Sequence, residues 1–590
     1  MTSQTFTHRE SVPHAVAENL TGFDVLTQQL LFSRGITTRE DANVFFAKEY
    51  ETGLHDPFLL PDMEKAVARI LSAIEKKERI GIFSDYDCDG IPGGVLLHDL
   101  FVMIGYENFC NYIPHRHEEG YGLSIEGIDH LKNDGVSLII TVDCGIQDVE
   151  KVTHANAIGV DVIVTDHHEP SATLPPALAV IDPKRTDNRY PFPELCGTGI
   201  AYKLACALLK KGNECGMFSV SPGQEKWLLD LVGIATVADM VPLRGENRIL
   251  AHYGLSVLRK GRRLGLQHLF RVMKTSIQTV SEDDIGFMIA PRINAASRMG
   301  NPRDAFLLLA TRSEADAGTY ARHVDGINTE RKGVVAAMVK EVKRKLALRS
   351  HIDAVLVIGD PLWRPSLVGL VANTLAEEYQ RPVFVWGRDG RNILKGSCRS
   401  GGAMSVFTLM QEAAHLFVEY GGHHASGGFA VKEECIHTLS DALNAAQSTL
   451  SSQSILKESE VSQGLFIDST LTLAEVAPAL VRTLSNFAPF GQGNPKPIFL
   501  FQGVVPTRVE IFGKQKAHTK IIFQNGRREL VAIGFFMLPQ EYGVTPTPGV
   551  PLDVVAHVEE SFFMGRSEVR LRIVSCEPAR NPEGVPGGLT

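Results

Sequence analysis

The chain has 590 residues, of which 44% are apolar and 22% are charged, and this composition is typical of a globular protein with several hydrophobic cores. The length suggests three or four domains at about 100–200 residues each. The formal net charge of −9 excludes a generally basic protein that coats nucleic acid, but it is compatible with a local basic groove.

The nine cysteines are scattered along the chain, and none forms a CxxC pair. Such spacing indicates reduced thiols in a cytoplasm rather than a disulfide framework or a zinc site. The amino-terminal residues show no basic segment followed by an apolar run, and no window approaches the roughly 18 apolar residues of a membrane span. We therefore expect a cytoplasmic protein that has no membrane segment.

The first 55 residues are expected to form a short, mostly helical lead-in. Short apolar runs then alternate with segments of helix length, and this alternation is typical of βαβ units on a parallel sheet. The expected strands are residues 79–83, 136–142 and 160–165. The fold class that follows is α/β.

Each of these three expected strands ends at acidic or imidazole side chains. The first runs into the sequence FSDYDCDG, which places three carboxylates at alternate positions within five residues. Because the carboxyl ends of parallel strands meet at one edge of a sheet, we expect these groups to share a site. The candidate metal ligands, including one delivered by an expected helix over 226–237, are Asp85, Asp87, Asp89, Asp143, Asp166, His167, His168 and Asp239.

Carboxylate oxygens with some imidazole nitrogen suit manganese or magnesium better than a thiolate-preferring metal. Two such ions about 4 Å apart activate water and stabilise the leaving oxygen in phosphoryl hydrolysis. An isolated DxDxD is alternatively a solvated loop or a weak calcium site, and a lone Asp-His-His is a weaker signal still. Three acidic strand ends on one sheet favour the metal centre, since so many acids do not converge without cations.

A long helical region is expected over 225–345, and a second α/β unit follows it, with strands at 354–359 and 382–386. The polar segment 448–460 is interpreted as a helix end and a linker. The remaining pattern indicates a small β-barrel. Its expected strands are 503–511, 519–523, 530–536, 552–559 and 569–574.

Four segments resemble the motifs of the DHH phosphoesterases: DYDCDG (85–90), TVDCGI (141–146), TDHHEP (165–170) and ATVADMVPL (235–243). Within that superfamily, later segments resemble the RecJ family of single-stranded-DNA-specific 5′→3′ exonucleases, and they occur in the RecJ order. These segments are YIPHRHEEGYGLS (112–124), APRINAASRMG (290–300), GSCRS (396–400), GGHHASGGF (421–429) and FAPFGQGNPKPIF (487–499).

The resemblance implies a parallel-sheet DHH domain that a long helix joins to a smaller α/β DHHA1 domain, followed by a β-barrel OB-fold. The corresponding domains are a lead-in (1–55), the DHH catalytic domain (56–270), a connecting helical region (271–348), the DHHA1 domain (349–450) and the OB-fold (461–580). The implied activity is metal-dependent hydrolysis of single-stranded DNA from the 5′ end, which releases 5′-mononucleotides in recombination and repair.

The resemblance also implies roles for the candidate ligands. It assigns Asp87, Asp89, Asp143, His167, His168 and Asp239 to the metal site, which holds two Mn²⁺ or Mg²⁺ ions. Asp85 and Asp166 either ligate directly or orient a neighbouring ligand. One histidine of the pair is expected on metal, and the other on metal or on the scissile phosphate.

On the substrate side, the arginine fork suits phosphate oxygens. The family pattern places Arg116, Ser397 and Arg399 at a terminal 5′-phosphate and Arg298 near the scissile phosphate. The Gly421-Gly422-His423 segment either lets nucleic acid approach the backbone, with His423 as a polar contact, or forms a tight turn.

A basic cluster in the expected barrel is interpreted as a surface for single-stranded DNA. Its members are Arg508, Lys514, Lys516, His518 and Lys520. Phe512 and Phe523 either stack on bases or fill the core of the barrel.

Four positions depart from the family pattern: Ser297 and Ser366 stand where glycine is usual, Arg364 replaces a histidine, and Cys398 is the middle residue of GSCRS. None removes a metal ligand. A positive φ at Ser297 would introduce backbone strain.

The family resemblance implies a monomer with a single-strand-binding protein and a helicase as partners. One alternative is a DHH phosphodiesterase that acts on short oligonucleotides, cyclic dinucleotides or pyrophosphate. The extra barrel and the chain length argue against it. Another alternative is a non-catalytic DHH scaffold of replication, which would require lost ligands.

Overall fold

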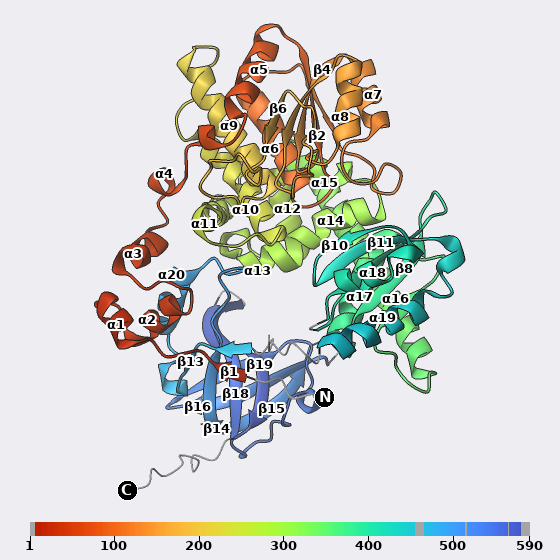
Figure 1. The fold of residues 1–590 in the computed structure, drawn as a ribbon. Coiled ribbons are helices and arrows are strands. Elements are labelled where there is room, and N and C mark those ends of the chain that lie inside the picture. Colours follow the sequence, from red (N-terminus) through yellow and green to blue (C-terminus); the bar gives the residue numbers. More distant parts are fainter. Residues whose placement is uncertain (1–5, 403, 455–464, 514–515, 564–565, 580–590) are drawn as a thin grey trace. The chain divides into compact units, whose positions relative to one another are not determined.

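The computed structural model describes residues 6–402, 404–454, 465–513, 516–563 and 566–579. The chain folds into two compact units (Figure 1). Unit 1 is formed by residues 1–53, 242–249 and 464–590, and unit 2 by residues 54–241 and 250–463.

The first part of unit 2 is built on a five-stranded parallel sheet. Its strands are β2 (Arg79–Ser84), β3 (Phe109–Tyr112), β4 (Val136–Val142), β5 (Asp161–Thr165) and β6 (Ala179–Ile181). They lie in the order β3-β2-β4-β5-β6, and every neighbouring pair is parallel. The predicted parallel sheet is confirmed, and the structure adds β3 and β6 at its edges.

Helices cover both faces of this sheet (Figure 1). α7 (Ile125–Asn133) and α8 (Val149–Ala157) lie on one face, and α5 (Met63–Glu75), α6 (Gly90–Met103) and α9 (Gly197–Glu214) lie on the other. A strand that is covered on both faces needs apolar side chains on both sides. This explains why β4 reads VSLIITV and is buried along nearly its whole length.

A helical region follows the parallel sheet, as the sequence predicts. Its α-helices are α10 (Leu229–Ala238), α11 (Gly245–Arg259), α12 (Leu264–Met273), α13 (Glu282–Asp284), α14 (Ala290–Met299), α15 (Arg303–Ala310) and α16 (Glu314–Ala347). The helix α16 has 34 residues and starts at a capping serine, because the Ser313 side chain accepts a hydrogen bond from the backbone N–H of Asp316.

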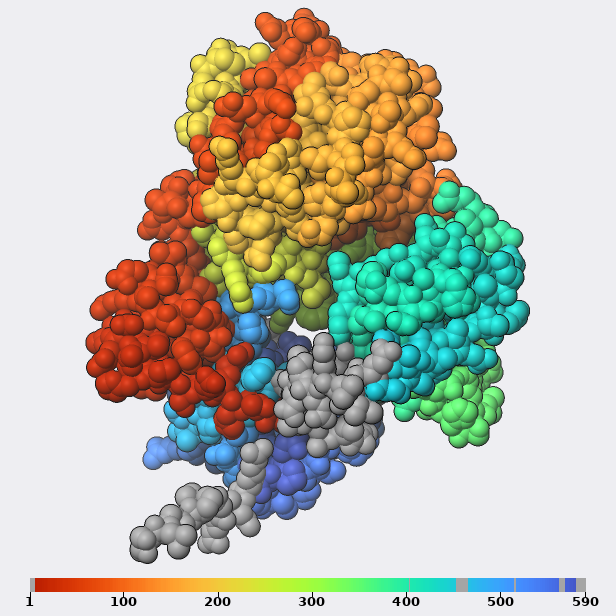
Figure 2. Space-filling view, viewed as in Figure 1, coloured from red at the N-terminus to blue at the C-terminus, as the bar shows by residue number. Residues whose placement is uncertain are grey.

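The second α/β part of unit 2 is a mixed sheet in the order β10-β11-β9-β8-β7. Its strands are β7 (Leu356–Gly359), β8 (Val383–Arg388), β9 (Leu394–Arg399), β10 (Phe417–Gly422) and β11 (Ser426–Val431). Its helices are α17 (Pro365–Tyr379), α18 (Val406–Glu412) and α19 (Leu439–Ser454). In Figure 2 the two α/β parts of unit 2 are seen as orange and turquoise surfaces.

Unit 1 contains a seven-stranded sheet in the order β13-β14-β18-β19-β17-β16-β15. Its strands are β13 (Ser469–Thr470), β14 (Phe499–Val504), β15 (Pro506–Phe512), β16 (His518–Asn525), β17 (Arg528–Gly534), β18 (Leu552–Phe563) and β19 (Arg566–Pro578). The helix α20 (Pro478–Phe487) contributes Leu480, Leu484 and Phe487 to the core beneath the sheet.

One strand expectation in this unit is wrong. The sequence predicted a single strand over 503–511, but the structure divides it between β14 and β15. Two residues explain the break. Gly503 has a φ of +58°, which a regular strand does not use, and Pro506 lacks the N–H that a continuing strand would donate.

The amino-terminal segment also belongs to unit 1. It forms β1 (Phe6–His8), α1 (His14–Asn19), α2 (Val25–Phe32), α3 (Arg39–Ala47) and α4 (Tyr50–Gly53). The strand β1 pairs in parallel with β12 (Leu465–Ile467), and Leu20, Leu30 and Leu31 join the same core as Phe487. This segment is therefore an integral part of the carboxy-terminal unit. Within the residues that the structure describes, no helix combines the length and apolar character that a membrane crossing requires.

Candidate metal centre

The predicted ligands meet at the carboxyl edge of the parallel sheet. The Asp85–Asp89 loop follows β2, Asp143 follows β4, and the pair His167-His168 comes two residues after β5. The helix α10 brings Asp239 to the same place as its carboxy-terminal cap. The topology thus assembles groups that are separated by up to about 150 positions in the chain, as expected for an open α/β sheet.

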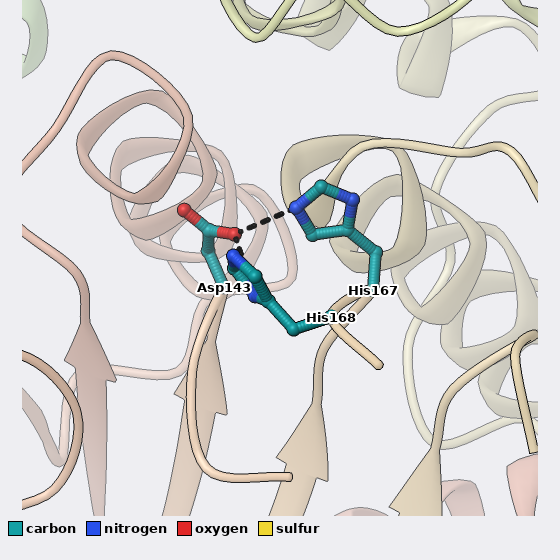
Figure 3. Close-up of side chains that lie close together, drawn as sticks. All are labelled: Asp143, His167 and His168. Atoms are coloured by element: carbon teal, nitrogen blue, oxygen red, sulfur yellow. Dashed lines mark ion pairs between the residues drawn. The ribbon is translucent and has the colours of Figure 1, made fainter. Parts of the chain in front are cut away.

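Three overlapping groups of side chains could each hold a metal ion. Each side chain offers one potential ligand atom, and within a group these atoms lie within 4.8 Å of one another. The first group is Asp143, His167 and His168 (Figure 3), the second is Asp89, His167 and Asp239, and the third is Asp85, Asp87 and Asp143. Because His167 and Asp143 each belong to two groups, the arrangement suits neighbouring ions that share ligands.

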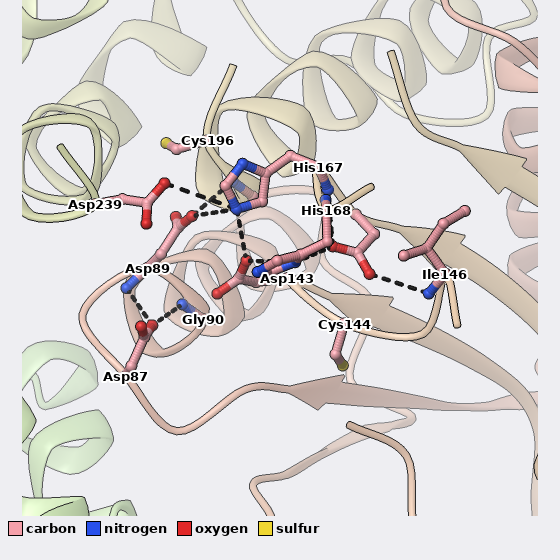
Figure 4. A network of polar contacts seen from close by, with 12 residues as sticks. Asp87, Asp89, Gly90, Asp143, Cys144, Ile146, His167, His168, Cys196 and Asp239 are labelled. Atoms are coloured by element: carbon pink, nitrogen blue, oxygen red, sulfur yellow. Dashed lines mark hydrogen bonds and ion pairs between the residues drawn. The ribbon is translucent and has the colours of Figure 1, made fainter. Parts of the chain in front are cut away.

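The imidazole of His167 lies at the centre of this arrangement (Figure 4). Its Nε2 lies 3.2 Å from Asp143 Oδ1 and 3.7 Å from both Asp89 Oδ2 and Asp239 Oδ2. Burial lowers the pKa of His167, and this effect exceeds the opposing charge of Asp89. The neutral ring is the form in which histidine binds a metal.

Asp89 is held by the amino terminus of α9. Its two carboxylate oxygens accept hydrogen bonds from the backbone N–H groups of Gly197 (2.6 Å) and Thr198 (2.7 Å). These N–H groups have no partner within the helix and carry partial positive charge, so they favour a carboxylate there. A Cβ at Gly197 would lie only 2.6 Å from Asp143 Cβ, so glycine at this position lets two candidate ligands approach the same helix end.

Asp143 adopts a left-handed backbone conformation with φ +62°, which aspartate tolerates better than most residues. The hydroxyl of Tyr121 donates a hydrogen bond to the backbone carbonyl of Asp143 (3.2 Å). Oδ1 of Asp143 and Oδ1 of Asp85 are both buried without a hydrogen-bond donor among the described residues. Buried acceptors of this kind need another partner, and a cation is one that suits two neighbouring carboxylates.

Asp166 behaves differently from the other acids, because the protein itself occupies its oxygens. Oδ2 accepts from the backbone N–H of Ile146 (3.0 Å), and Oδ1 accepts from the N–H of His167 (2.7 Å) and lies 2.7 Å from His168 Nδ1. Burial opposes ionisation, but the bond and charge of His168 prevail and lower the pKa of Asp166. This geometry suits a residue that orients the two histidines.

The contact with Asp166 also fixes His168. Burial alone would lower the pKa of His168, but the hydrogen bond with Asp166 raises this pKa to about 9. Since Nδ1 faces Asp166 and the Tyr121 hydroxyl (3.1 Å), Nε2 is the nitrogen left for a metal or a phosphate.

Like charges accumulate at this centre. Burial, followed by repulsion from neighbouring carboxylates, raises the pKa of Asp85 and Asp143 well above the ordinary value and that of Asp239 to about 8. Divalent cations relieve both the burial and the repulsion. Carboxylate and imidazole donors without thiolate match manganese or magnesium. The three buried or half-buried acids therefore fit a cation site.

A cavity of about 550 Å³ lies between the two α/β parts of unit 2, and of the predicted phosphate-binding residues Arg116 lines it. The guanidinium of Arg116 lies over the Tyr86 ring at 4.7 Å and faces this cavity. Arg298 Nη1 donates to the Ser366 carbonyl (2.7 Å). Burial, with Arg116 and Arg331 as lesser causes, lowers the pKa of Arg298 to about 10. The arginines therefore form a cationic cluster.

Two further predicted residues lie on β9. Ser397 and Arg399 lie beside α17, where a Cβ at Gly369 would lie 3.3 Å from Ser397 Oγ and 3.7 Å from Arg399 Nη2. His423 is exposed and lies in the β10–β11 hairpin turn, where its N–H donates to Ser426 O (2.8 Å). The turn interpretation of this glycine segment is thereby supported, and Gly421 also lines the cavity.

The basic cluster of unit 1 is partly neutralised. Arg508 pairs with Glu529 (2.9 Å), and Lys520 lies 3.7 Å from Glu510, whereas Lys516 is exposed. Lys514 lies outside the described residues. Phe523 is fully buried in the core, so of its two predicted roles the core role holds. The Phe512 ring lies 5.3 Å from the His518 ring.

Sequence reasoning did not single out Tyr121 or Thr198, although both contact the centre. Tyr121 stands in the glycine-rich EEGYG segment, and this segment is the sequence feature that could have indicated its role. The condition for strain at Ser297 is not met, since the residue is inside α14 and is not among those with positive φ. Cys398 is buried against Met410, and Arg364 is exposed.

Three family models match the chain: "DHH family, N-terminal domain" over residues 79–236, "DHHA1 domain" over 352–450 and "RecJ OB domain" over 467–575. Among curated proteins, the single-stranded-DNA-specific exonuclease RecJ of Bacillus subtilis (strain 168) is 34% identical over 551 residues, covering 93% of this chain and 67% of that protein. RecJ of Escherichia coli (strain K12) is 31% identical over 486 residues, covering 80% of this chain and 82% of that protein.

A solved structure of RecJ from Thermus thermophilus in complex with Mn²⁺ matches with a TM-score of 0.76 at 26% identity, over 98% of this chain and 80% of that one. A second structure of that protein, in complex with Mg²⁺, matches with a TM-score of 0.71 at 25% identity and covers 98% and 79% of the two chains. Both similarities extend over the two units described above.

Proposed function

Since the chain belongs to the RecJ family, we propose that it is a single-stranded-DNA-specific exonuclease that hydrolyses phosphodiesters from the 5′ end and releases 5′-mononucleotides. The observation that carries this proposal is the convergence of three overlapping carboxylate–imidazole groups at the sheet edge. Two related proteins are named single-stranded-DNA-specific exonucleases, and a related structure holds Mn²⁺.

We assign the metal-binding role to Asp85, Asp87, Asp89, Asp143, His167, His168 and Asp239. Their shared members, His167 and Asp143, support a site for two ions. Bound divalent ions supply the positive charge that activates a water and stabilises the leaving oxygen. Asp89, His167 and His168 would also act in catalysis by holding those ions at the sheet edge. Asp166 orients the histidines and stays off the metal, because its oxygens are already bonded.

The chain's own contribution to phosphate chemistry is its arginines. Arg298 is buried near the cavity and is anchored to the Ser366 carbonyl. It is positioned to share the charge that develops on the scissile phosphate. Arg116, Ser397 and Arg399 receive the terminal 5′-phosphate. A strand anchored in this way presents its first internal phosphodiester to the metal centre, which explains release of single nucleotides.

The cavity between the two α/β parts of unit 2 is proposed to admit a single strand and to exclude a duplex. His423 contributes a polar contact from the β10–β11 turn. Lys514, Lys516 and Lys520 bind the backbone of the strand on unit 1, and of these Lys516 is exposed without an acidic partner among the described residues. The family membership further supports a cytoplasmic monomer that works with a single-strand-binding protein and a helicase in recombination and repair.

The test uses purified protein, manganese and a long single strand with a 5′-phosphate and an internal label. Duplex DNA, a 3′-blocked strand, a dinucleotide and the Asp89→Ala/His168→Ala double variant are run in parallel. Release of 5′-mononucleotides that ignores the 3′ block, and that is lost in the double variant, is the expected result. Rapid dinucleotide cleavage without digestion of long strands would instead assign the chain to the phosphodiesterases of short oligonucleotides.

A further inference from the structure

A second groove lies along α16 and α17. It has a volume of about 760 Å³, which is within the roughly 300–1,000 Å³ range of small-molecule sites. Its floor is apolar and includes Val335, Val339 and Leu370. Its cationic lining residues are Arg331, Lys332, Lys340, Lys343 and Arg399. No carboxylate is among the described residues that line it.

The periodicity of α16 produces this pattern. Arg331, Val335, Val339 and Lys343 are spaced four residues apart, so they share one face of the helix. Lys332 and Lys340 belong to the neighbouring row. The cations at the two ends of this row, Arg331 and Lys343, are therefore about 18 Å apart at 1.5 Å per residue, and the apolar Val335 and Val339 lie between them. This row suits a ligand that has an apolar body and phosphate groups.

The cations of the groove lack sufficient protein partners. Nε of Arg331 is buried and has no hydrogen-bond partner among the described residues. Burial, and then the nearby guanidinium of Arg292, lower the pKa of Arg331, and no acid is among the causes. Lys340 is exposed and forms no ion pair within the described part of the chain. Lys343 alone is neutralised, because it lies 2.6 Å from Glu378.

The groove adjoins the proposed phosphate sites. Arg399 lines the groove and is also the proposed ligand of the terminal 5′-phosphate. Arg331 is close enough to Arg298 to contribute to its lowered pKa. Additional phosphates on a 5′ end would extend from Arg399 into a groove whose other cations, apart from Lys343, form no ion pair among the described residues. Charge-assisted bonds to guanidinium and ammonium groups are strong.

We infer that the α16–α17 groove binds the phosphate chain of a nucleoside 5′-triphosphate. Only one part of this inference, the role of Arg399 at the terminal 5′-phosphate, rests on the proposed function. Two sources offer this chemistry: a strand whose 5′ end carries a triphosphate, and a free nucleoside triphosphate that occupies the groove and competes for Arg399.

Binding is measured first, with the full chain in EDTA so that no metal bridges the phosphates. Calorimetric titrations compare dATP with dAMP on the unaltered chain and on Lys340→Gln, Arg331→Gln and Arg344→Gln. Arg344 is the matched control, since it is exposed on the same helix and does not line the groove. We expect dATP to bind more tightly than dAMP, and the two groove variants to weaken dATP binding by about 5- to 10-fold each. Arg344→Gln should have no effect.

Digestion with manganese then separates the two sources. If the strand end is the ligand, Lys340→Gln slows digestion of a 5′-triphosphorylated strand and leaves a 5′-monophosphorylated strand unaffected. If the free nucleotide is the ligand, dATP inhibits digestion of the monophosphorylated strand, and Lys340→Gln relieves that inhibition.

The inference is overturned if dATP fails to bind in EDTA, or binds the groove variants as tightly as the unaltered chain. Failure of the proposed nuclease function would instead abolish digestion and leave the EDTA titrations intact.

Discussion

Arg298 and Ser366 hold each other through two reciprocal hydrogen bonds. Arg298 Nη1 donates to the Ser366 carbonyl (2.7 Å), and the Ser366 hydroxyl donates to the Arg298 carbonyl (2.8 Å). The pair joins the end of α14 to the start of α17, and Arg364 Nη1 lies 3.4 Å from the neighbouring Met299 carbonyl. A glycine at position 366, as the family pattern has it, would provide the carbonyl without the hydroxyl. The departure at Ser366 therefore adds a bond that positions the proposed phosphate ligand.

The Ser366→Ala substitution should lower kcat on single-stranded DNA by about 3- to 10-fold, the equivalent of one hydrogen bond of about 1 kcal/mol. The reason is that Arg298 keeps its side-chain anchor but loses the bond that fixes its backbone. Steady-state kinetics on a 5′-phosphorylated strand measure the effect, with KM expected to change little.

The control for this substitution is Ser256→Ala, which removes a hydroxyl donor to the His252 carbonyl at 3.0 Å in α11. Manganese affinity should be the same in both variants. Equal kcat values for Ser366→Ala and the unaltered chain would show that the hydroxyl does not position Arg298.

Replacing Asp166 with asparagine should weaken manganese binding by about 10- to 100-fold, although Asp166 is not proposed to touch the metal. The carboxylate accepts hydrogen bonds from the N–H groups of Ile146 and His167 and orients His168. An amide cannot accept through both of its polar atoms, so the histidine geometry loosens. Titration of the purified protein with Mn²⁺, followed calorimetrically, measures the change.

Asp134→Asn is the matched control for that experiment, since Asp134 is a half-exposed carboxylate at the end of α7. It should bind manganese as the unaltered chain does. If Asp166→Asn also binds normally, the two histidines are oriented by other contacts and the role proposed for Asp166 is wrong.

The convergence of these side chains can be predicted from the sequence because its signal is local. Asp89, Asp143 and His167 each follow an apolar run, and the topology of a parallel sheet then brings strand ends together without further information. His167 shares one potential metal-binding group with Asp89 and another with Asp143, as the meeting of parallel strand ends predicts. Asp239 follows an expected helix rather than a strand, and the resemblance of its motif to that of a known family added support for it.

The contacts that hold these ligands in place could not be predicted in the same way. The backbone N–H groups of Gly197 and Thr198 hold Asp89 across more than 100 residues, and a backbone group leaves no mark in a sequence. The same is true of β1, whose residues Phe6–His8 pair with Leu465–Ile467. Strands of three residues offer too little periodicity to reveal such a partner.

Acid stability should depend on Glu78, which lies at the opposite end of the parallel sheet from the metal centre. Burial opposes its ionisation, but hydrogen bonds from Arg69 (2.6 Å) and Ser137 (2.7 Å) prevail and lower its pKa. A carboxyl whose pKa is lower in the folded state stabilises the fold above its unfolded pKa of about 4.3. That contribution is lost as the pH falls through the folded value.

Glu78→Gln should therefore lower the thermal midpoint by about 1–2 °C at pH 7, and the difference should shrink as the pH falls below about 4. Differential scanning calorimetry at several pH values measures it. Glu64→Gln, an exposed acid in the first turn of α5, provides the control. A difference that is constant with pH would mean that the charge of Glu78 contributes nothing.

Arg263 should be the arginine whose loss most destabilises the helical part of unit 2. Its guanidinium donates to Asp230 (2.9 Å), Asp99 (3.0 Å) and the Leu309 carbonyl (2.7 Å), so it joins α10, α6 and α15. Arg263→Met leaves the buried carboxylate of Asp230 without its arginine and removes the nearer of two arginines from the half-buried Asp99. This should lower the free energy of unfolding by about 3–5 kcal/mol. Arg312 lies 3.7 Å from the same Asp99, but its side chain is 68% exposed, so Arg312→Met should cost less than about 1 kcal/mol. Urea unfolding followed by circular dichroism compares the two variants. Equal losses would show that burial of the Arg263 network does not determine its contribution.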